Sequence, residues 1–478
     1  MYKAYITTLT NVRKHPNADR LLLADVFGNT VCVSTNYCEG EIGVYFPTDG
    51  QLSIEFASQN NLLRKKDENG NNVGGYMDPD KRNVTAIRLR GEKSDGLFLP
   101  LSCLTYTGVN MDTLNVGDVI DGTVNGHEIC CKYIPRSDTR RGTVTEGNRT
   151  RKKKVATAPL FKEHADTEQL AYNLSAFKPG DEIEITLKMH GTSQRTGYLP
   201  VFKGYKRTFM DWLCRRQGNP IYDWGYVSGT RRVVLENYEG GFYGDNQFRE
   251  QHSKIFEGKL WKGETVYYEV VGFTTSGAPI MSTASNSKLQ DKEFIKQYGQ
   301  ETVFSYGCEP EASTLWRPDG QGDLDLVGRI KQSDIYVYRM TMTNEDGEVV
   351  EYTPDFMRYR CEQMAVKTVP VFFRGTILET QTNEDGSVEY QLSNGKMLGV
   401  CVGEEAIGGM VKEAAEYYYD GPDPVGKTHV REGVVVRIIN RPKFAAYKHK
   451  NFSFKVLEGI AKVEAEAPDM EEAQEVEE

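Results

Sequence analysis

Polar and apolar residues alternate along much of this chain, which is the pattern of half-buried β-strands. The clearest example is residues 182–187, where charged or hydroxyl side chains alternate with isoleucine and leucine. Residues 266–273 and 432–437 continue the pattern, and each run also carries a glutamate. A helical period is rare and is best developed at residues 409–419. The pattern therefore predicts an α+β protein with a predominantly antiparallel sheet architecture.

Two hairpins are predicted by the sequence Thr-Asn-Glu-Asp-Gly, which occurs at residues 343–347 and again at residues 382–386. Each copy lies between strand-like runs, and Asp-Gly is a strong marker of a tight hairpin turn. We interpret the repetition as convergent turn chemistry and not as a duplicated structural unit.

The N-terminal part is β-rich in shorter pieces, which are separated by turns containing Gly, Asn and Asp. Several short strands in so few residues favour a small closed barrel, because closure removes exposed sheet edges. Residues 15–26 resemble the opening of tRNA-binding OB-folds; the structural alternative is a turn in which Asn17 and Asp19 cap a strand. The predicted strands are 31–34, 43–46, 84–90 and 96–100.

Composition divides the chain into a barrel-like domain (1–131), a basic linker (132–154), a larger α+β domain (155–460) and an acidic tail (461–478). The linker holds nine bases and two acids and has no apolar period. It is either a solvated connection or a strap that tracks the phosphates of a nucleic acid, and its surplus of positive charge favours the strap. The residues predicted to bind this nucleic acid are Arg149, Arg151, Lys152, Lys153 and Lys154.

The overall composition, with 39% hydrophobic and 26% charged residues, is that of a globular protein in water. No run of about 20 apolar residues is present, and the N-terminus lacks the apolar core of a signal peptide. We therefore expect a cytoplasmic protein without a membrane partner. Nine scattered cysteines without C-x-x-C spacing argue against a disulfide scaffold or a structural zinc site. The net charge of −10 owes much to residues 464–478, which hold eight acids and no base, so it does not exclude a nucleic-acid partner.

Candidate chemistry begins where the 182–187 strand ends. Lys188, Met189 and His190 are followed there by Gly191, and Ser193 comes two residues later. A lysine beside a glycine turn suits covalent catalysis, because the turn lets the backbone approach a ligand closely. Taken alone, these residues fit a solvated loop better, because a lysine near a glycine turn is usually a solvated loop residue.

Other stretches contain residues that could act together with Lys188 in one catalytic site. Glu269 and Glu432 lie in apolar runs, where an unpaired carboxylate is costly. Lys448 and Lys450 are two residues apart and share one face if the segment is extended. An aromatic residue such as Tyr338, by itself, fits a hydrophobic core better than a cofactor site.

In their order along the chain, these residues resemble the motifs of covalent nucleotidyltransferases. The resemblance is greatest to ATP-dependent RNA ligases of the nick-sealing type, in the branch with an N-terminal OB domain. That family has a Lys-x-(Asp/His)-Gly nucleophile, an Arg, a Glu, an aromatic, a second Glu and a Lys-x-Lys. Residues 88–100 and 161–167 are similar to its barrel signature and its lead-in. The matching residues here are Lys188, Arg231, Glu269, Tyr338, Glu432, Lys448 and Lys450.

The resemblance implies an OB-like β-barrel followed by an antiparallel-sheet nucleotidyltransferase domain. It implies that Lys188 attacks the α-phosphate of ATP and carries AMP as a lysyl phosphoramidate. Lys448 and Lys450 would act in catalysis by neutralising phosphate charge, and they would also contact the nucleotide. Glu432 would contact the nucleotide site and hold Mg²⁺, or Mn²⁺ in its place.

The remaining motif residues are expected to bind the nucleotide. Tyr338 would stack on adenine, and Met189, Ser193 and Glu269 would contact the nucleotide as well. The arginine of the second motif is Arg231 or its neighbour at position 232. His190 is interpreted as catalytic, because His also occurs at this position among nick-sealing RNA ligases, although Asp is common there.

The leading hypothesis is an RNA-repair enzyme that uses ATP to join 3′-OH and 5′-phosphate RNA ends, with ATP and RNA as its partners. One alternative is another covalent nucleotidyltransferase, either a DNA ligase or a capping enzyme that uses GTP. The other is a non-enzymatic tRNA-binding OB protein with an inert second domain. The sequence leaves open which RNA is repaired, the template strand and the oligomeric state.

Overall fold

The computed structural model describes residues 2–48, 50–66, 72–133, 157–164, 167–209, 213–214, 218–231, 233–235, 238, 246–304, 332–427, 429–458 and 461–462. The chain forms two compact units. The first consists of Met1–Val144, Asn286–Phe294 and Phe452–Glu478. The second consists of Thr145–Ser285 and Ile295–Asn451.

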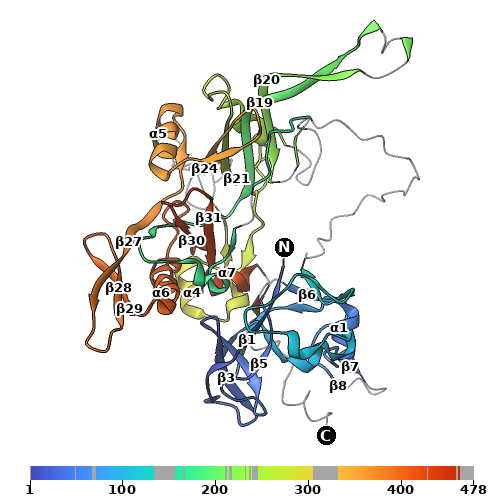
Figure 1. The fold of residues 1–478 in the computed structure, drawn as a ribbon, viewed down its shortest axis with the longest axis vertical. Coiled ribbons are helices and arrows are strands. Elements are labelled where there is room, and N and C mark those ends of the chain that lie inside the picture. Colours follow the sequence, from blue (N-terminus) through green and yellow to red (C-terminus); the bar gives the residue numbers. More distant parts are fainter. Residues whose placement is uncertain are drawn as a thin grey trace, which may run out of the picture. The chain divides into compact units, whose positions relative to one another are not determined.

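The second unit contains a seven-stranded sheet whose apolar face packs against α6 (Ile407–Tyr419) (Figure 1). Alternate residues of its strands, such as Ile183, Ile185 and Val436, are buried with Met410 of this helix. The predicted strand at 182–187 and helix at 409–419 are therefore confirmed. In sheet order the strands are β17 (Glu168–Gln169), β31 (Ala445–Lys450), β30 (Gly433–Ile438), β18 (Glu182–Leu187), β27 (Val371–Thr382), β28 (Val388–Ser393) and β29 (Met397–Val402).

A six-stranded sheet forms the other half of this unit, and β21 is central to its apolar core. Val266, Tyr268 and Val270 of β21 are buried with residues of α3 (Gln247–Lys254) and α5 (Pro354–Met364). The strands are β20 (Asn219–Thr230), β19 (Thr192–Lys206), β21 (Glu264–Gly272), β24 (Ser333–Thr343) and β25 (Val349–Glu351), with β26 (Lys367–Thr368) paired to β24.

Both predicted hairpins are present in the second unit. The turn at residues 343–347 joins the antiparallel strands β24 and β25, and the turn at 382–386 joins β27 and β28. Gly347 and Gly386 have φ of 84° and 83°, a conformation that glycine adopts without strain. The second unit also contains a short antiparallel pair, β22 (Ala284–Ser285) with β23 (Glu301–Thr302).

The first unit is also rich in sheet, and it is assembled from short strands that belong to several sheets. In the described residues the strand pairings do not close into a barrel, so the predicted OB-like barrel is not confirmed, whereas the mixed α+β class is. The larger sheets have the orders β12-β5-β1-β13, β2-β3-β4, β16-β6-β9 and β11-β10-β32. Their strands are β1 (Ala4–Thr8), β2 (Thr10–Lys14), β3 (Leu21–Val26), β4 (Asn29–Ser34), β5 (Ile42–Phe46), β6 (Gly50–Leu52), β9 (Asn83–Val84), β10 (Ala86–Leu89), β11 (Glu92–Asp95), β12 (Leu97–Pro100), β13 (Val119–Ile120), β16 (Cys130–Lys132) and β32 (Ala461–Lys462).

Smaller elements complete the description. Two further strand pairs are β7 (Lys65–Lys66) with β8 (Asn72–Gly74) and β14 (Thr123–Val124) with β15 (His127–Glu128). The remaining α-helices are α1 (Ile54–Gln59), α4 (Lys292–Tyr298) and α7 (Phe452–Leu457).

The segment that resembles tRNA-binding proteins has a structural role in the first unit. The buried His15 ring accepts a hydrogen bond at Nδ1 from the backbone N–H of Asn17 (3.1 Å), so Nε2 carries the proton and donates to the carbonyl of Leu89 (3.1 Å). The Asn17 amide donates to the carbonyl of Arg90 (2.8 Å). These bonds fix the turn against the end of β10.

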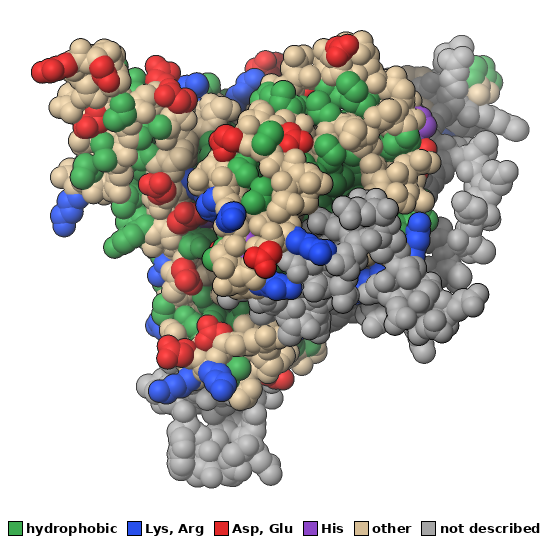
Figure 2. All heavy atoms as spheres, turned by 90° about the horizontal axis from the view of Figure 1, so that it is seen from below, with side chains coloured by type: hydrophobic (Ala, Val, Ile, Leu, Met, Phe, Trp, Pro, Cys, Tyr) green, Lys and Arg blue, Asp and Glu red, His purple; other side chains and the backbone are tan. Residues whose placement is uncertain are grey.

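The surface of the described residues carries charges of both signs. Acidic and basic side chains are interspersed on the face shown in Figure 2, with hydrophobic side chains between them. Within the described part of the chain, no helix is long and apolar enough to cross a membrane.

Candidate active site

Lys188 directly follows β18 and lies where the chain passes from one sheet of the second unit to the other. The isoleucines of β18 face the apolar core, whereas Glu184 and Thr186 line a cavity together with Lys188. The backbone N–H of Lys188 donates to the carbonyl of Gly433 (3.0 Å), and the chain then enters β19 of the other sheet. The period-2 pattern thus determines the side from which Lys188 emerges.

Two glycines allow the strands of this region to approach closely. A Cβ at Gly191 would lie 2.4 Å from the carbonyl oxygen of Val270 and 3.0 Å from Cγ of Glu269. A Cβ at Gly433 would lie 2.1 Å from the carbonyl oxygen of His449, and the φ of Gly433 is 147°. Any side chain at either position would push the lysine loop or the glutamate strand out of place.

Three basic groups converge on the Glu432 carboxylate, which is 2% exposed. Lys188 Nζ lies 2.7 Å from Oε1, and Lys450 Nζ lies 3.0 Å from the same oxygen. His190 Nδ1 lies 3.2 Å from Oε2. The loop after β18 and the strand β31 therefore bring their basic groups to one carboxylate, which directly precedes β30.

The two glutamates of the site have opposite electrostatic environments. Burial alone would raise the pKa of Glu432, but the charges of Lys188, Lys450 and His190 hold that pKa well below its usual range. Burial raises the pKa of Glu269 to about 7; Lys188 opposes this shift, and Glu432 adds to it. One carboxylate is thus kept ionised, while the other is close to half-protonated at neutral pH.

A cavity of about 220 Å³ opens beside this cluster. Its wall includes seven of the residues selected from the sequence, and Lys188 belongs both to the wall and to the ion-pair cluster. Those seven are Lys188, Met189, Ser193, Arg231, Glu269, Tyr338 and Lys448.

Some predicted residues lie elsewhere. His190, Glu432 and Lys450 are in the ion-pair cluster next to the cavity and not on its lining. The arginine at position 232 lies outside the described residues. So do the predicted RNA-binding residues Arg149, Arg151, Lys152, Lys153 and Lys154.

The aromatic wall of the cavity is held by hydrogen bonds. The hydroxyl groups of Tyr338 and Ser193 are 2.9 Å apart, and burial raises the pKa of Tyr338. The His164 ring centroid lies 5.2 Å from that of Tyr338, and Arg339 Nη1 donates to His164 Nδ1 (3.1 Å). Since Nδ1 accepts, the proton of a neutral His164 is on Nε2.

Comparison with solved structures shows one recurrent fold. A lysine-to-alanine mutant of the Naegleria gruberi RNA ligase with ATP and Mn matches with a TM-score of 0.53 and 16% identity, over 96% of this chain and 98% of that chain. The same ligase with PPi gives a TM-score of 0.51 and 16% identity, with coverages of 95% and 97%. A lysine-to-methionine mutant with AMP and Mn gives 0.51 and 16%, with coverages of 95% and 98%.

The chain has the fold of an RNA ligase. The match extends over nearly the whole length of both chains, so it includes the first unit as well as the second. No protein-family model and no curated protein sequence matches the chain.

Within this RNA-ligase fold, Arg249 of α3 is a site residue that sequence reasoning missed. It is 4% exposed, and its guanidinium donates to Thr192 Oγ1 (2.5 Å) and to the carbonyl of Ser193 (3.3 Å). The Gln194 amide donates back to the Arg249 carbonyl (2.9 Å). Arg249 therefore fixes the backbone that follows the lysine loop. No periodicity around position 249 marks it, because its partners are more than fifty residues away.

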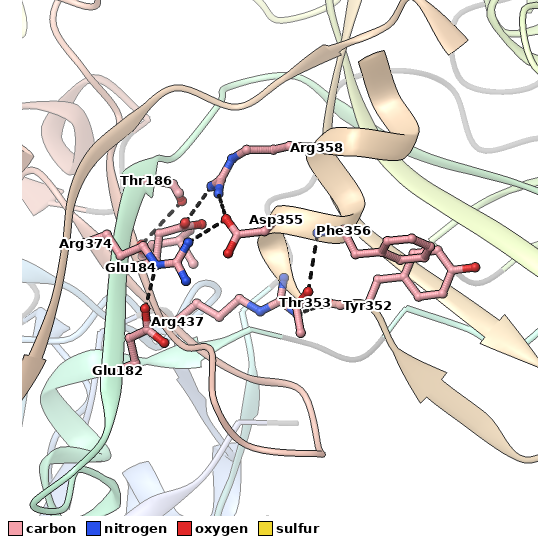
Figure 3. A network of polar contacts seen from close by, with 11 residues as sticks. Glu182, Glu184, Thr186, Tyr352, Thr353, Asp355, Phe356, Arg358, Arg374 and Arg437 are labelled. Atoms are coloured by element: carbon pink, nitrogen blue, oxygen red, sulfur yellow. Dashed lines mark hydrogen bonds and ion pairs between the residues drawn. The ribbon is translucent and has the colours of Figure 1, made fainter. Parts of the chain in front are cut away.

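A second missed feature is the charged network that joins α5 to β18 and β27 (Figure 3). Arg358 Nη2 donates to Glu184 Oε2 (2.5 Å), and Asp355 Oδ1 accepts from Arg374 (2.5 Å). Arg374 also donates to Glu182 (2.7 Å). Because Glu184 lines the cavity, this network connects α5 to the cavity wall.

Arg437 of β30 is also on the cavity wall and is 8% exposed. Its Nη2 donates to the carbonyl of Tyr352 (3.1 Å) (Figure 3). In the described part of the chain, its buried Nε has no hydrogen-bond partner. A bound molecule with an acceptor atom would satisfy this donor.

Proposed function

We propose that the protein is an ATP-dependent RNA ligase that joins 3′-OH and 5′-phosphate RNA ends through a lysyl-AMP intermediate. The observation that carries the proposal is the position of Lys188. Its Nζ lies 2.7 Å from the buried Glu432 carboxylate, at the edge of a cavity lined by Glu269 and Tyr338. The RNA-ligase fold of the chain supports the same conclusion.

In the first step, Lys188 Nζ attacks the α-phosphorus of ATP. A P–N bond forms as the bond to the bridging oxygen breaks, pyrophosphate leaves, and the amine loses its proton. Lys448 and Lys450, adjacent on one face of β31, would offset the negative charge that builds on the phosphate. Tyr338 would stack on adenine, with Met189 and Ser193 beside the nucleotide.

The donor set fits a divalent cation. Glu432 supplies a buried, ionised carboxylate that already attracts three basic groups, and carboxylate and phosphate oxygens are the ligands that Mg²⁺ and Mn²⁺ prefer. A bound cation would neutralise charge on the phosphates. Occupation of Glu432 would also remove the ion-pair partner that holds Lys188, and so release the amine toward the nucleotide.

In the later steps, AMP passes from Lys188 to the 5′-phosphate of RNA, and the 3′-OH then attacks that phosphate and displaces AMP. His190, which is held against Glu432, and Arg231 on the cavity wall would position the phosphates during these transfers. The basic segment that contains Arg149, Arg151, Lys152, Lys153 and Lys154 would bind the RNA backbone, and the first unit would supply a second contact.

The test is incubation with α-labelled ATP and Mg²⁺ or Mn²⁺. Label should become attached to the protein and be discharged by a nicked RNA duplex, with the nick sealed. Lys188→Ala should abolish labelling, whereas the exposed turn lysine in Lys396→Ala should leave it unchanged. Label from GTP and not from ATP would indicate a capping enzyme, and sealing of nicked DNA alone would indicate a DNA ligase. Absence of label from both nucleotides would contradict covalent catalysis and favour a binding protein.

A further inference from the structure

Strands β19 and β20 extend beyond the rest of their sheet as a two-stranded arm (Figure 1). β21 pairs with β19 from Thr192 to Gly197, whereas β20 continues to pair with β19 as far as Lys206. The arm begins in the candidate site, because Ser193 at its base lines the cavity. The residues from Ser193 to Phe202 span about 30 Å at the usual rise of a strand.

One face of the arm carries a row of aromatic rings. The register places Tyr198 opposite Tyr226 and Phe202 opposite Tyr222, with Trp224 between these pairs. The ring centroids of Tyr198 and Tyr226 are 4.7 Å apart, those of Tyr198 and Trp224 are 5.8 Å apart, and those of Phe202 and Tyr222 are 6.0 Å apart. Beyond the bulge, Tyr205 packs on Phe202 with centroids 5.0 Å apart.

The opposite face of the arm base is already covered. Leu199 and Val227 are buried there with Ala158 and Phe161. The carbonyl of Thr157 accepts from the backbone N–H of Phe202 (2.7 Å), so the segment at residues 157–161 runs along the arm. The aromatic rings are on the other face. Tyr198 and Tyr226 at the base pack against the core of the six-stranded sheet, whereas the rings farther out, from Trp224 to Tyr205, are half-buried outside that core. A row of large apolar rings left at the surface marks an interaction site.

The charge of the arm favours a polyanion. Lys203, Lys206 and Arg207 are exposed, and Asp223 is the single acidic residue among the described residues of the arm. Lys262 Nζ lies 5.2 Å from the ring centroid of Trp224, which adds a base beside the aromatic row. The described residues of the arm therefore carry a net positive charge, which is complementary to phosphates.

We propose that this arm binds a single-stranded segment of the RNA substrate. The nucleobases would stack on the aromatic row, and the phosphates would contact the flanking lysine and arginine side chains. Single strands are favoured over duplexes because only unstacked bases can lie on aromatic side chains. The inference rests on the proposed function. Phe202 is about 30 Å along the strand from Ser193 of the cavity wall, so nucleotides bound at the outer rings would flank the RNA ends that react.

The test compares two fluorescent nicked RNA duplexes that differ only by a single-stranded oligouridine tail. Binding is measured by anisotropy without ATP, so its result does not depend on the proposed chemistry. Tyr205→Ala/Tyr222→Ala should weaken binding of the tailed duplex by about tenfold, the value of one lost base stack, and leave the untailed duplex unchanged. Tyr205→Phe/Tyr222→Phe should retain binding, since the ring and not the hydroxyl stacks. Tyr417→Ala, a change at a 74% exposed ring on α6, is the matched control.

A second variant tests the charges without disturbing the ring packing. Lys203→Gln/Lys206→Gln/Arg207→Gln should reduce the salt slope for the tailed duplex by about 2, at ~0.7 per phosphate contact on a single strand. Self-adenylylation by all arm variants should equal that of wild type, which also shows that they are folded. Equal losses on both duplexes, or no loss on either, would overturn the proposal; retained RNA binding would then leave the arm as a protein-binding surface.

Discussion

At the scale of single residues, the site depends on how each carboxylate is surrounded. Glu432 is buried and Glu269 is partly buried on the cavity wall. Their pKa values move in opposite directions because the nearest basic groups face Glu432. Groups whose pKa values are separated in this way are common where chemistry occurs. The sequence identifies both glutamates as unusual, but the direction of each shift depends on distances to lysines from other strands.

The raised pKa of Glu269 predicts a pH dependence of stability. Between its ordinary pKa of 4.5 and the folded value of about 7, the folded protein binds more protons than the unfolded chain at this group. Its contribution to the free energy of unfolding therefore falls as pH rises through that window. Glu269→Gln removes this titrating carboxyl group, so the wild-type protein should lose stability relative to the variant as the pH rises from 5 to 8. Urea unfolding of both proteins measures this difference, and a difference that is constant with pH would contradict it.

The close approach at Gly191 makes a second residue-scale prediction. Gly191→Ala forces a methyl group against the Val270 carbonyl, so we expect a loss of about 2 kcal/mol in the free energy of unfolding, and the displaced loop should lower self-adenylylation. Gly409→Ala is the control, because its Cβ meets nothing within 4 Å on a helix. There the change should be neutral or stabilising by up to ~1 kcal/mol. Equal thermal shifts for the two variants would refute the packing argument.

At the scale of elements, α5 is the helix that connects the six-stranded sheet to the cavity wall. Arg358 pairs with Glu184, whose side chain is 4% exposed, whereas Arg374 pairs with Glu182, which is 32% exposed (Figure 3). Removing a partner from a buried carboxylate costs far more than breaking an exposed pair. Arg358 should therefore contribute more to the free energy of unfolding than Arg374 does.

The corresponding experiment compares Arg358→Met with Arg374→Met. The first should lower the free energy of unfolding by about 3 kcal/mol, and the second by less than ~1 kcal/mol. Adding Glu184→Gln to Arg358→Met should recover part of the loss, because the uncompensated charge is removed. Chemical denaturation of the single and double variants measures these free energies of unfolding. Equal losses for the two arginine variants would contradict the expectation that Arg358 stabilises the protein more than Arg374 does.

The elements show where sequence reasoning succeeds and where it stops. The period-2 run at residues 182–187 and the Asp-Gly turns after β24 and β27 depend on local chemistry, and all three predictions are confirmed. Helix α5 was missed, although Thr353 caps it and Pro354 begins it, which are recognisable local signals. The Glu184–Arg358 pair joins positions 174 residues apart and leaves no such signal. The predicted OB-like barrel is not confirmed. The period of a strand shows which of its faces is buried, but it does not determine which strands pair at their edges.

At the scale of the whole molecule, acidic and basic residues are unevenly distributed along the chain. The chain has 68 acidic and 58 basic residues, but nine of the bases are in residues 132–154 and eight of the acids are in residues 464–478. Attraction between bases and RNA phosphates releases counterions, so its strength depends on salt. The whole-chain charge is consequently a poor guide to RNA affinity.

The basic segment makes a prediction at this scale. Lys152→Gln/Lys153→Gln/Lys154→Gln should weaken RNA binding and reduce the slope of log affinity against log salt by about 2 to 3, while self-adenylylation with ATP is unchanged. Binding titrations across a range of salt concentrations measure the slope. An unaltered slope would show that these lysines do not contact phosphates.

The central claim is that Lys188 is the residue that carries AMP, and peptide mass spectrometry after incubation with ATP and Mn²⁺ tests it most directly. We expect AMP attached to the peptide that contains Lys188, loss of the adduct in Lys188→Ala, and its discharge when nicked RNA is added. AMP found on another lysine, or no adduct on a folded protein supplied with ATP and metal, would contradict it.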